Sequence, residues 1–220
     1  PTIPKLTPMT LRTPLSSPRN LGLCVVAALL LTAGLSSCGG KIPPTNYYVL
    51  ELPSVPRAQA EAFPATAVVA PFRASQMLTQ DRIVYRPAAG EVGFYEYHRW
   101  AEDPRQTITS TFIDRLQALG TFATVVPLDG RTKADYMLRG RIEKLEEVDY
   151  GGGVSVHVRL SAELVSFDDR KLIWQGVTEQ KGQVGVGEVS AVVAEMSRAV
   201  RAGLDKLTAE LDGWVRANVS

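Results

Sequence analysis

The sequence contains little of what thiol, metal or nucleic-acid chemistry requires. Its 220 residues include only two cysteines, Cys24 and Cys38, and two histidines, His98 and His157. The formal net charge is +1 and no segment gathers lysine and arginine densely, so the basic surface expected of a nucleic-acid-binding protein is missing. The chain is 45% hydrophobic and 21% charged, which suffices for a buried core and excludes a disordered or fibrous protein.

Motifs of common enzymes are also missing. The sequence has no G-x-S-x-G elbow and no G-x-x-x-x-G-K-[ST] phosphate loop, and the glycines within 182–187 do not form a G-x-G-x-x-G motif. His157 falls on the polar face of an alternating strand, which favours a structural role, and no histidine has metal-site spacing. Asp168-Asp169 is typical of a hairpin turn. We therefore predict no enzyme, no catalytic residue, no metal and no cofactor.

The excess of basic residues is confined to the N-terminal segment. Residues 1–37 carry Lys5, Arg12 and Arg19 and no acid, which leaves 21 basic against 23 acidic residues in the rest of the chain. An apolar run follows at residues 21–35, shorter than the roughly 20 residues that cross a bilayer. A basic region followed by a short apolar region is typical of a secretory signal, so residues 1–37 are predicted to be a signal peptide.

The end of the apolar run predicts a lipid anchor. Leu35-Ser36-Ser37-Cys38 resembles the bacterial lipobox, in which diacylglycerol is joined to the cysteine, the signal is cut before it, and the new amino terminus is acylated. The alternative is an ordinary signal followed by a chance cysteine. Each buried acyl methylene contributes about 0.8 kcal/mol, so several chains on Cys38 would hold the protein on a membrane. The mature chain would then have no free thiol and no disulfide.

The residues after the cysteine suggest a location and a tether. Gly39 follows Cys38 in place of aspartate, and similarity to other lipoproteins then implies the periplasmic side of the outer membrane, with the inner membrane left open. Residues 38–45 are rich in glycine and proline and are predicted to form a lipidated tether. Residues 46–216 are predicted to form the periplasmic domain.

Hydrophobic periodicity predicts a single α+β domain, in which a mainly antiparallel or mixed sheet is covered by two helices. Asp103 as N-cap, Pro104 and a C-terminal Gly120 predict a helix over 104–119. An apolar stripe predicts a second helix over 188–214, covering the sheet of its own domain. Alternation predicts a three-stranded antiparallel meander over 135–180, with a bulge near Leu145. Shorter elements are predicted as strands at 47–52, 66–70, 82–86, 92–97 and 122–126, with one helical turn within 74–80.

Several motifs occur in an order that resembles a known family. After the lipobox come Tyr47-Tyr48-Val49-Leu50, Arg82-Ile83-Val84-Tyr85-Arg86, Tyr97-His98-Arg99-Trp100-Ala101-Glu102-Asp103-Pro104 before a helix, and Ala134-Asp135-Tyr136 before a long strand. This set, between Thr45 and Leu211, resembles the ABC-type transport auxiliary lipoproteins, the PqiC-like family. The chain departs from the family at 182–187, which is less polar than expected.

The resemblance implies a role in lipid transport. Such lipoproteins accompany ABC transporters whose MCE (mammalian cell entry) domain proteins move phospholipid or other hydrophobic molecules between two membranes. It implies a non-enzymatic docking subunit whose partners are an MCE-domain protein, a permease and an ATPase, with the membrane bound through the anchor and no nucleic acid. A homo-oligomer is compatible with it. The alternatives are an envelope-assembly lipoprotein for peptidoglycan or outer-membrane biogenesis, a lipoprotein hydrolase, and a lipid carrier with an internal cavity.

The aromatic cluster before the first predicted helix supplies candidate contact residues. We predict that Tyr95, Tyr97, Arg99 and Trp100 contact a partner, because tyrosine and tryptophan bury large areas at little cost in entropy. The alternative is that most of these aromatic side chains fill the core.

Overall fold

One long strand, β7 (Tyr136–Asp149), connects every part of the sheet. The computed structural model describes residues 42–57, 61–185 and 188–218. Within these residues the sheet has nine strands. The others are β1 (Asn46–Tyr48), β2 (Phe63–Val69), β3 (Arg73–Ala74), β4 (Arg82–Arg86), β5 (Gly93–Trp100), β6 (Phe122–Pro127), β8 (Val154–Ser166) and β9 (Leu172–Gln183). The helices are the short 3₁₀ helix η1 (Gln76–Thr79), α2 (Pro104–Leu119) and α3 (Val189–Asn218).

The two edges of β7 are paired differently. On one edge it pairs antiparallel with β8, which pairs antiparallel with β9, and this confirms the predicted meander. On the other edge it pairs in turn with β2, β3 and β4, all parallel. Because β2 continues to β6 while β4 continues to β5 and β1, the sheet divides into two arms, with the two-residue β3 between them. We call this region the fork of the sheet.

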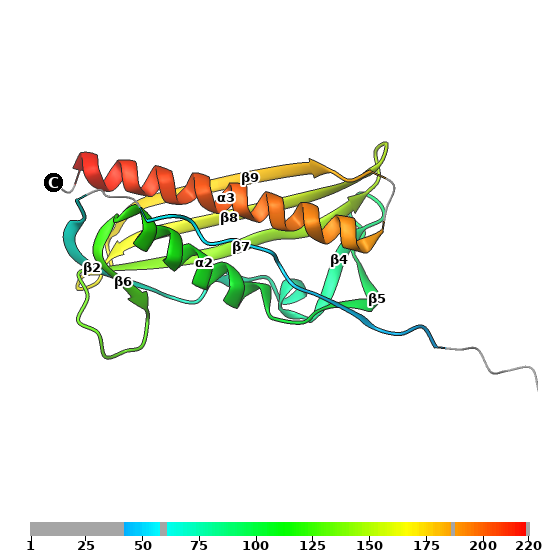
Figure 1. The fold of residues 1–220 in the computed structure, drawn as a ribbon, viewed down its shortest axis with the longest axis horizontal. Helices are drawn as coiled ribbons and strands as arrows, with labels where there is room; N and C mark the ends of the chain where they lie inside the picture. Colours follow the sequence, from blue (N-terminus) through cyan, green and yellow to red (C-terminus); the bar gives the residue numbers. More distant parts are fainter. Residues whose placement is uncertain (1–41, 58–60, 186–187, 219–220) are drawn as a thin grey trace, which may run out of the picture. The chain divides into compact units, whose positions relative to one another are not determined.

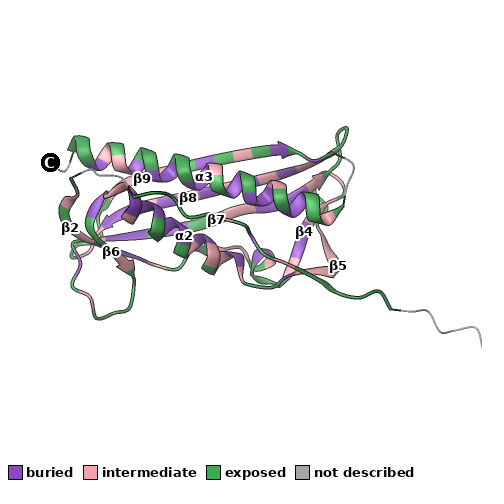
Figure 2. Ribbon diagram, in the orientation of Figure 1, coloured by how far each residue is buried: buried purple, intermediate pink, exposed green. Residues whose placement is uncertain are grey.

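Two helices cover the sheet, as predicted; both lie on one face of it, and α3 runs along β8 and β9 (Figure 1). The side of α3 that faces the strands is buried and its outer side is exposed (Figure 2). Phe112 of α2 packs edge-on against Phe72, with ring centroids 5.4 Å apart. Leu160, Leu164 and Leu204 are fully buried in the same core. The predicted α+β fold with a mixed sheet and two covering helices is confirmed.

Local sequence signals place the helix ends well. The side chain of Asp103 accepts a hydrogen bond from the backbone N–H of Arg105 at 2.9 Å, and Gly120 ends α2 in the left-handed region with φ of 67°. α3 extends to Asn218, four residues beyond the predicted end. The bulge in β7 lies between Ile142 and Lys144, close to its predicted place.

The first predicted strand is shorter than its sequence suggests. β1 ends at Tyr48, although the β-forming residues continue to Leu52. The backbone N–H of Glu51 donates to the hydroxyl of Ser197 on α3 at 3.0 Å, and Leu50 is buried in the core. The chain therefore leaves the sheet after Tyr48 and continues along the helix.

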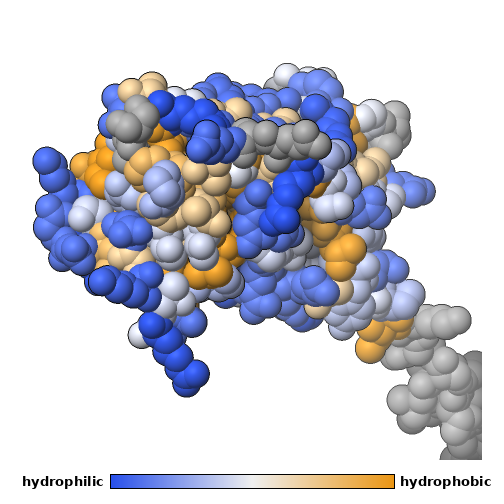
Figure 3. Space-filling model, turned by 60° about the vertical axis from the view of Figure 1, so that its left-hand side comes forward, coloured by the Kyte–Doolittle hydropathy of each residue, from blue (hydrophilic) through white to orange (hydrophobic). Residues whose placement is uncertain are grey.

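The predicted signal peptide, Cys38 and residues 39–41 of the tether lie outside the described residues. None of the described helices is long and apolar enough to cross a membrane. On the face in Figure 3, apolar side chains lie in patches separated by charged ones. Isolated apolar patches of this kind are normal on a protein surface.

Candidate functional site

The four residues predicted to contact a partner lie on β5 but differ in exposure. Trp100 is only 7% exposed and packs in the main core. Arg99 is partly exposed and its guanidinium donates to the carboxylate of Asp81 at 2.7 Å. Tyr95 and Tyr97 are also partly exposed. Trp100 is therefore a core residue, and the other three retain surface that a partner can contact.

Two consecutive glutamates at the end of β7 hold the β4–β5 hairpin. The hydroxyl of Tyr95 donates to Glu147 at 2.9 Å, and Arg86 donates to Glu146 at 2.8 Å. Successive strand residues point to opposite faces, so the hairpin is held from both sides of the sheet. The two glutamates are only 2% and 4% exposed. The sequence did not mark these two glutamates as functional. Its one indication of an irregularity in this region was the predicted bulge near Leu145.

Glu147 gives a prediction about the pH dependence of stability. Burial is the largest cause and raises the pKa of the Glu147 carboxyl. The hydrogen bond from Tyr95 lowers this pKa, and the charge of Asp149 raises it further. A folded-state pKa above the unfolded value means that the folded protein holds the proton more tightly, so stability is lost as pH rises above the unfolded pKa. We expect Glu147→Gln, which keeps an acceptor for Tyr95, to increase the free energy of unfolding at pH 7 but not near pH 4. Urea denaturation at both pH values measures this.

The control for that experiment is Glu91→Gln, in an exposed turn. An equal gain from Glu91→Gln, or a loss of stability at pH 7 from Glu147→Gln, would contradict the assignment of a destabilising charge to Glu147.

The face of β7, β8 and β9 that points away from the helices carries a ladder of ion pairs. Arg159 binds both Glu143 and Glu179, each at 2.7 Å. The hydrogen bond from Arg159 is the largest cause that lowers the pKa of Glu179 to about 2, so this carboxylate is charged at neutral pH. Ion pairs between exposed side chains are weakened by the surrounding water and contribute little to stability. The ladder therefore marks a solvated sheet face.

The two histidines do not form a hydrolytic site with a serine. His157 lies 2.8 Å from Glu179 and 3.5 Å from the amine of Lys144, and burial lowers its pKa. His98 is hydrogen-bonded to the hydroxyl of Tyr48 at 2.9 Å. Over 42–57, 61–185 and 188–218, no serine hydroxyl bonds either ring, and no three His, Cys, Asp or Glu side chains are grouped as a metal site.

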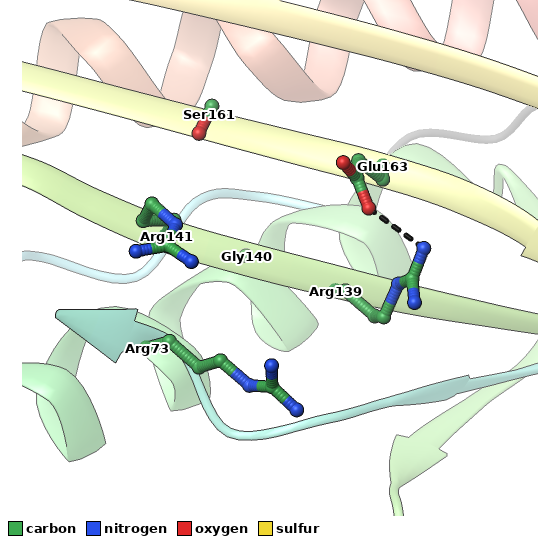
Figure 4. Close-up of a pocket in the computed structure, with 6 residues that line it drawn as sticks. All are labelled: Arg73, Arg139, Gly140, Arg141, Ser161 and Glu163. Atoms are coloured by element: carbon green, nitrogen blue, oxygen red, sulfur yellow. Dashed lines mark ion pairs between the residues drawn. The ribbon is translucent and has the colours of Figure 1, made fainter. Parts of the chain in front are cut away.

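A small pocket of about 120 Å³ opens on the charged face at the fork. Its lining residues are Arg73, Arg139, Gly140, Arg141, Ser161 and Glu163 (Figure 4). Arg139 is paired with Glu163 at 2.8 Å. Arg73 on β3 and Arg141 on β7 are register partners, and neither makes an ion pair within the part of the chain that the structure describes. We call these two residues the arginine pair.

An apolar groove of about 410 Å³ lies beside α2. Its lining includes the apolar Pro71, Phe72, Ile113 and Pro127 and the exposed Ser110, together with Asp103, Arg105, Gln106 and Thr109. A third hollow, of about 540 Å³, shares the arginine pair with the pocket and shares Pro71 and Phe72 with the groove. The three hollows therefore adjoin one another around the fork. Sequence analysis missed this site, because Arg73 belongs to a two-residue strand that no periodic pattern marks.

Comparisons with known proteins agree with this fold. The crystal structure of XCC0632 from Xanthomonas campestris has a TM-score of 0.64 at 20% identity and covers 77% of this chain and 94% of its own. A second crystal structure, of an uncharacterized protein, has a TM-score of 0.60 at 14% identity and covers 77% and 99%. A search of curated proteins found no match.

The match to a protein-family model assigns the chain to a family, whereas the similar structures show only its fold. Residues 48–207, most of the domain described above, match the family model for the ABC-type transport auxiliary lipoprotein component. The matched segment begins within β1 and ends within α3, so it includes the whole meander, the fork and α2. This chain belongs to the family of ABC-type transport auxiliary lipoprotein components.

Proposed function

We propose that this protein is the lipid-anchored periplasmic accessory subunit of an MCE-type ABC transporter, which moves phospholipid or other hydrophobic molecules across the cell envelope. The observation that carries the proposal is the family match over residues 48–207, directly after a lipobox-like cysteine and a short tether. The subunit acts as a docking piece and not as an enzyme. The sequence has no phosphate loop, so a separate ATPase supplies the energy.

The arrangement of the domain is compatible with docking. Both helices cover one face of the sheet, which leaves the charged face and the exposed part of β5 available to a partner. The tether at 38–45 has eight residues, which span on the order of 25 Å when extended. A domain on such a tether can meet a partner while its acyl chains stay in the membrane.

The test is affinity purification of the tagged protein from crosslinked native membranes, read by mass spectrometry. We expect an MCE-domain protein, a permease and an ATPase to be recovered together, and to be weakened by Cys38→Ala. The double variant Tyr97→Ala/Arg99→Ala is expected to reduce their recovery if β5 contacts the partner. The matched control is Arg201→Ala on the exposed side of α3.

The alternatives give different results in the same experiment. Recovery of only peptidoglycan or outer-membrane assembly factors would contradict the transporter role and support an envelope-assembly lipoprotein. A lipoprotein hydrolase would show turnover of an ester or amide substrate that is lost on His157→Gln.

A further inference from the structure

The arginine pair places two residues of like charge at partner positions on neighbouring strands. Neighbouring strands lie about 4.8 Å apart, and like charges in register destabilise a sheet. The carboxylates that line the adjoining hollows, Glu163 and Asp103, are already bound to other arginines. In Figure 4 the one dashed line joins Arg139 to Glu163, and none reaches Arg73 on β3 or Arg141 on β7. An anion bound between them would remove this repulsion.

The chemistry of the pair selects for a phosphate or a similar group. A guanidinium presents a planar fork of N–H donors that matches phosphate and carboxylate oxygens. The hydroxyl of Ser161 lies in the same pocket and is a further polar group. The pocket, at about 120 Å³, has room for a head group and little more.

The adjoining groove requires that the ligand also have an apolar part. Its volume of about 410 Å³ is within the range of small-molecule sites, and carbon atoms form most of its lining. Phe72 contributes to both the groove and the hollow that leads to the arginine pair. A ligand that fills all three hollows therefore needs a negative group at one end and a hydrocarbon chain at the other.

We infer that the fork of the sheet binds one anionic phospholipid, with its phosphate on Arg73 and Arg141 and one acyl chain in the groove beside α2. This goes beyond the proposed function, because it gives the accessory subunit its own lipid contact. It does not depend on which protein the subunit docks with.

The distribution of charge favours a lipid over an acidic protein segment. The cations without an ion-pair partner at the fork are two residues at one end of an apolar groove, whereas Arg139 and Arg159 on the same face are bound to glutamates. An acidic segment would be matched by a row of free cations along the face. Two clustered cations beside an apolar groove match a single charged head and its chain.

The test uses the mature lipidated protein in a neutral detergent, with bound lipid counted by native mass spectrometry. The probes are dioleoyl phosphatidylglycerol, dioleoyl phosphatidylcholine and inorganic phosphate. We expect one phosphatidylglycerol to bind, at least tenfold more tightly than phosphatidylcholine. Arg73→Gln/Arg141→Gln is expected to weaken this binding at least tenfold, and Arg131→Gln/Arg201→Gln, which removes the same charge elsewhere, is expected to leave it unchanged.

A second pair of variants tests the groove. Ser110 is exposed on α2 at the rim of the groove, so Ser110→Trp is expected to fold normally, fill the groove and weaken phosphatidylglycerol binding. Ser190→Trp, at an exposed position in the first turn of α3, is the matched control.

Three outcomes would overturn the inference. Unchanged phosphatidylglycerol binding in the double arginine variant would exclude the arginine pair. Equal competition by inorganic phosphate, with no effect of Ser110→Trp, would leave an anion pocket without lipid. Equal competition by a glutamate-rich peptide would assign the fork to an acidic protein segment. None of these results changes what the crosslinking experiment recovers, so the two proposals fail independently.

Discussion

Cys38→Ala is expected to abolish incorporation of fatty acid into the protein completely. A thioether to diacylglycerol requires the thiol, and the mature chain contains no other cysteine if the signal is cut before Cys38. Metabolic labelling with an alkyne fatty acid, followed by purification of the tagged protein, measures this directly. Cys24→Ala is the matched control, because Cys24 lies in the apolar run and is removed with the signal. Label on the Cys38→Ala variant, or its loss in Cys24→Ala, would contradict the lipobox assignment.

The same anchor predicts where the protein is found in the cell. An unprocessed Cys38→Ala precursor keeps its apolar run, so the informative variant exchanges residues 1–38 for a cleavable signal that has no cysteine. We expect this variant in the soluble periplasmic fraction, because loss of several acyl chains removes about 0.8 kcal/mol for each buried methylene. The unaltered protein is expected to stay with membranes in high salt. Membrane retention of the exchanged variant would show that the domain itself binds the membrane.

Gly140→Ala is expected to destabilise the domain by about 1–3 kcal/mol. A Cβ atom at Gly140 would lie 2.2 Å from two ring carbons of Phe72, far closer than real carbon atoms approach. Phe72 is 2% exposed and packs against Phe112 of α2, so making room for the Cβ atom would displace its ring from this packing. Urea denaturation of the purified protein measures the loss.

The control is a glycine with open space around it. A Cβ at Gly213, on the exposed side of α3, would meet no atom within 4 Å. Gly213→Ala is therefore expected to stabilise the protein by about 0.5–1 kcal/mol through the higher helix propensity of alanine. If both variants changed stability in the same direction, the contact between Phe72 and β7 would not be the cause.

The elements that the sequence predicted correctly are those with local signals. The caps of α2 lie next to the helix they end, and the meander is joined by short turns, so periodicity and turn residues sufficed. The fork has no such signal. β2, β3 and β4 reach β7 across long stretches of chain, and a parallel pairing of that kind depends on the packing of the whole domain.

The candidate site was predicted less well for a related reason. Trp100 and Tyr97 belong to one aromatic cluster in the sequence, yet the first is buried in the core and the second is partly exposed. Composition shows that the cluster exists, but the two residues are three apart on β5 and point to opposite faces, and composition does not tell which face is buried. Arg141 lies within the predicted meander, whereas its partner Arg73 comes from a segment with no predicted strand.

The position of β1 also determines how the domain responds to mechanical force. With a lipid on Cys38, as predicted, tension on the anchor would enter the folded domain at Asn46, where three residues of β1 pair in parallel with β5. A pull along the strand loads these hydrogen bonds together, in shear. Because β1 has only three residues, we expect it to detach first, and each released residue would lengthen the tether by about 3.3 Å. The meander and α3 bear the force only after β1 has detached. The tether can therefore lengthen while the rest of the domain stays folded.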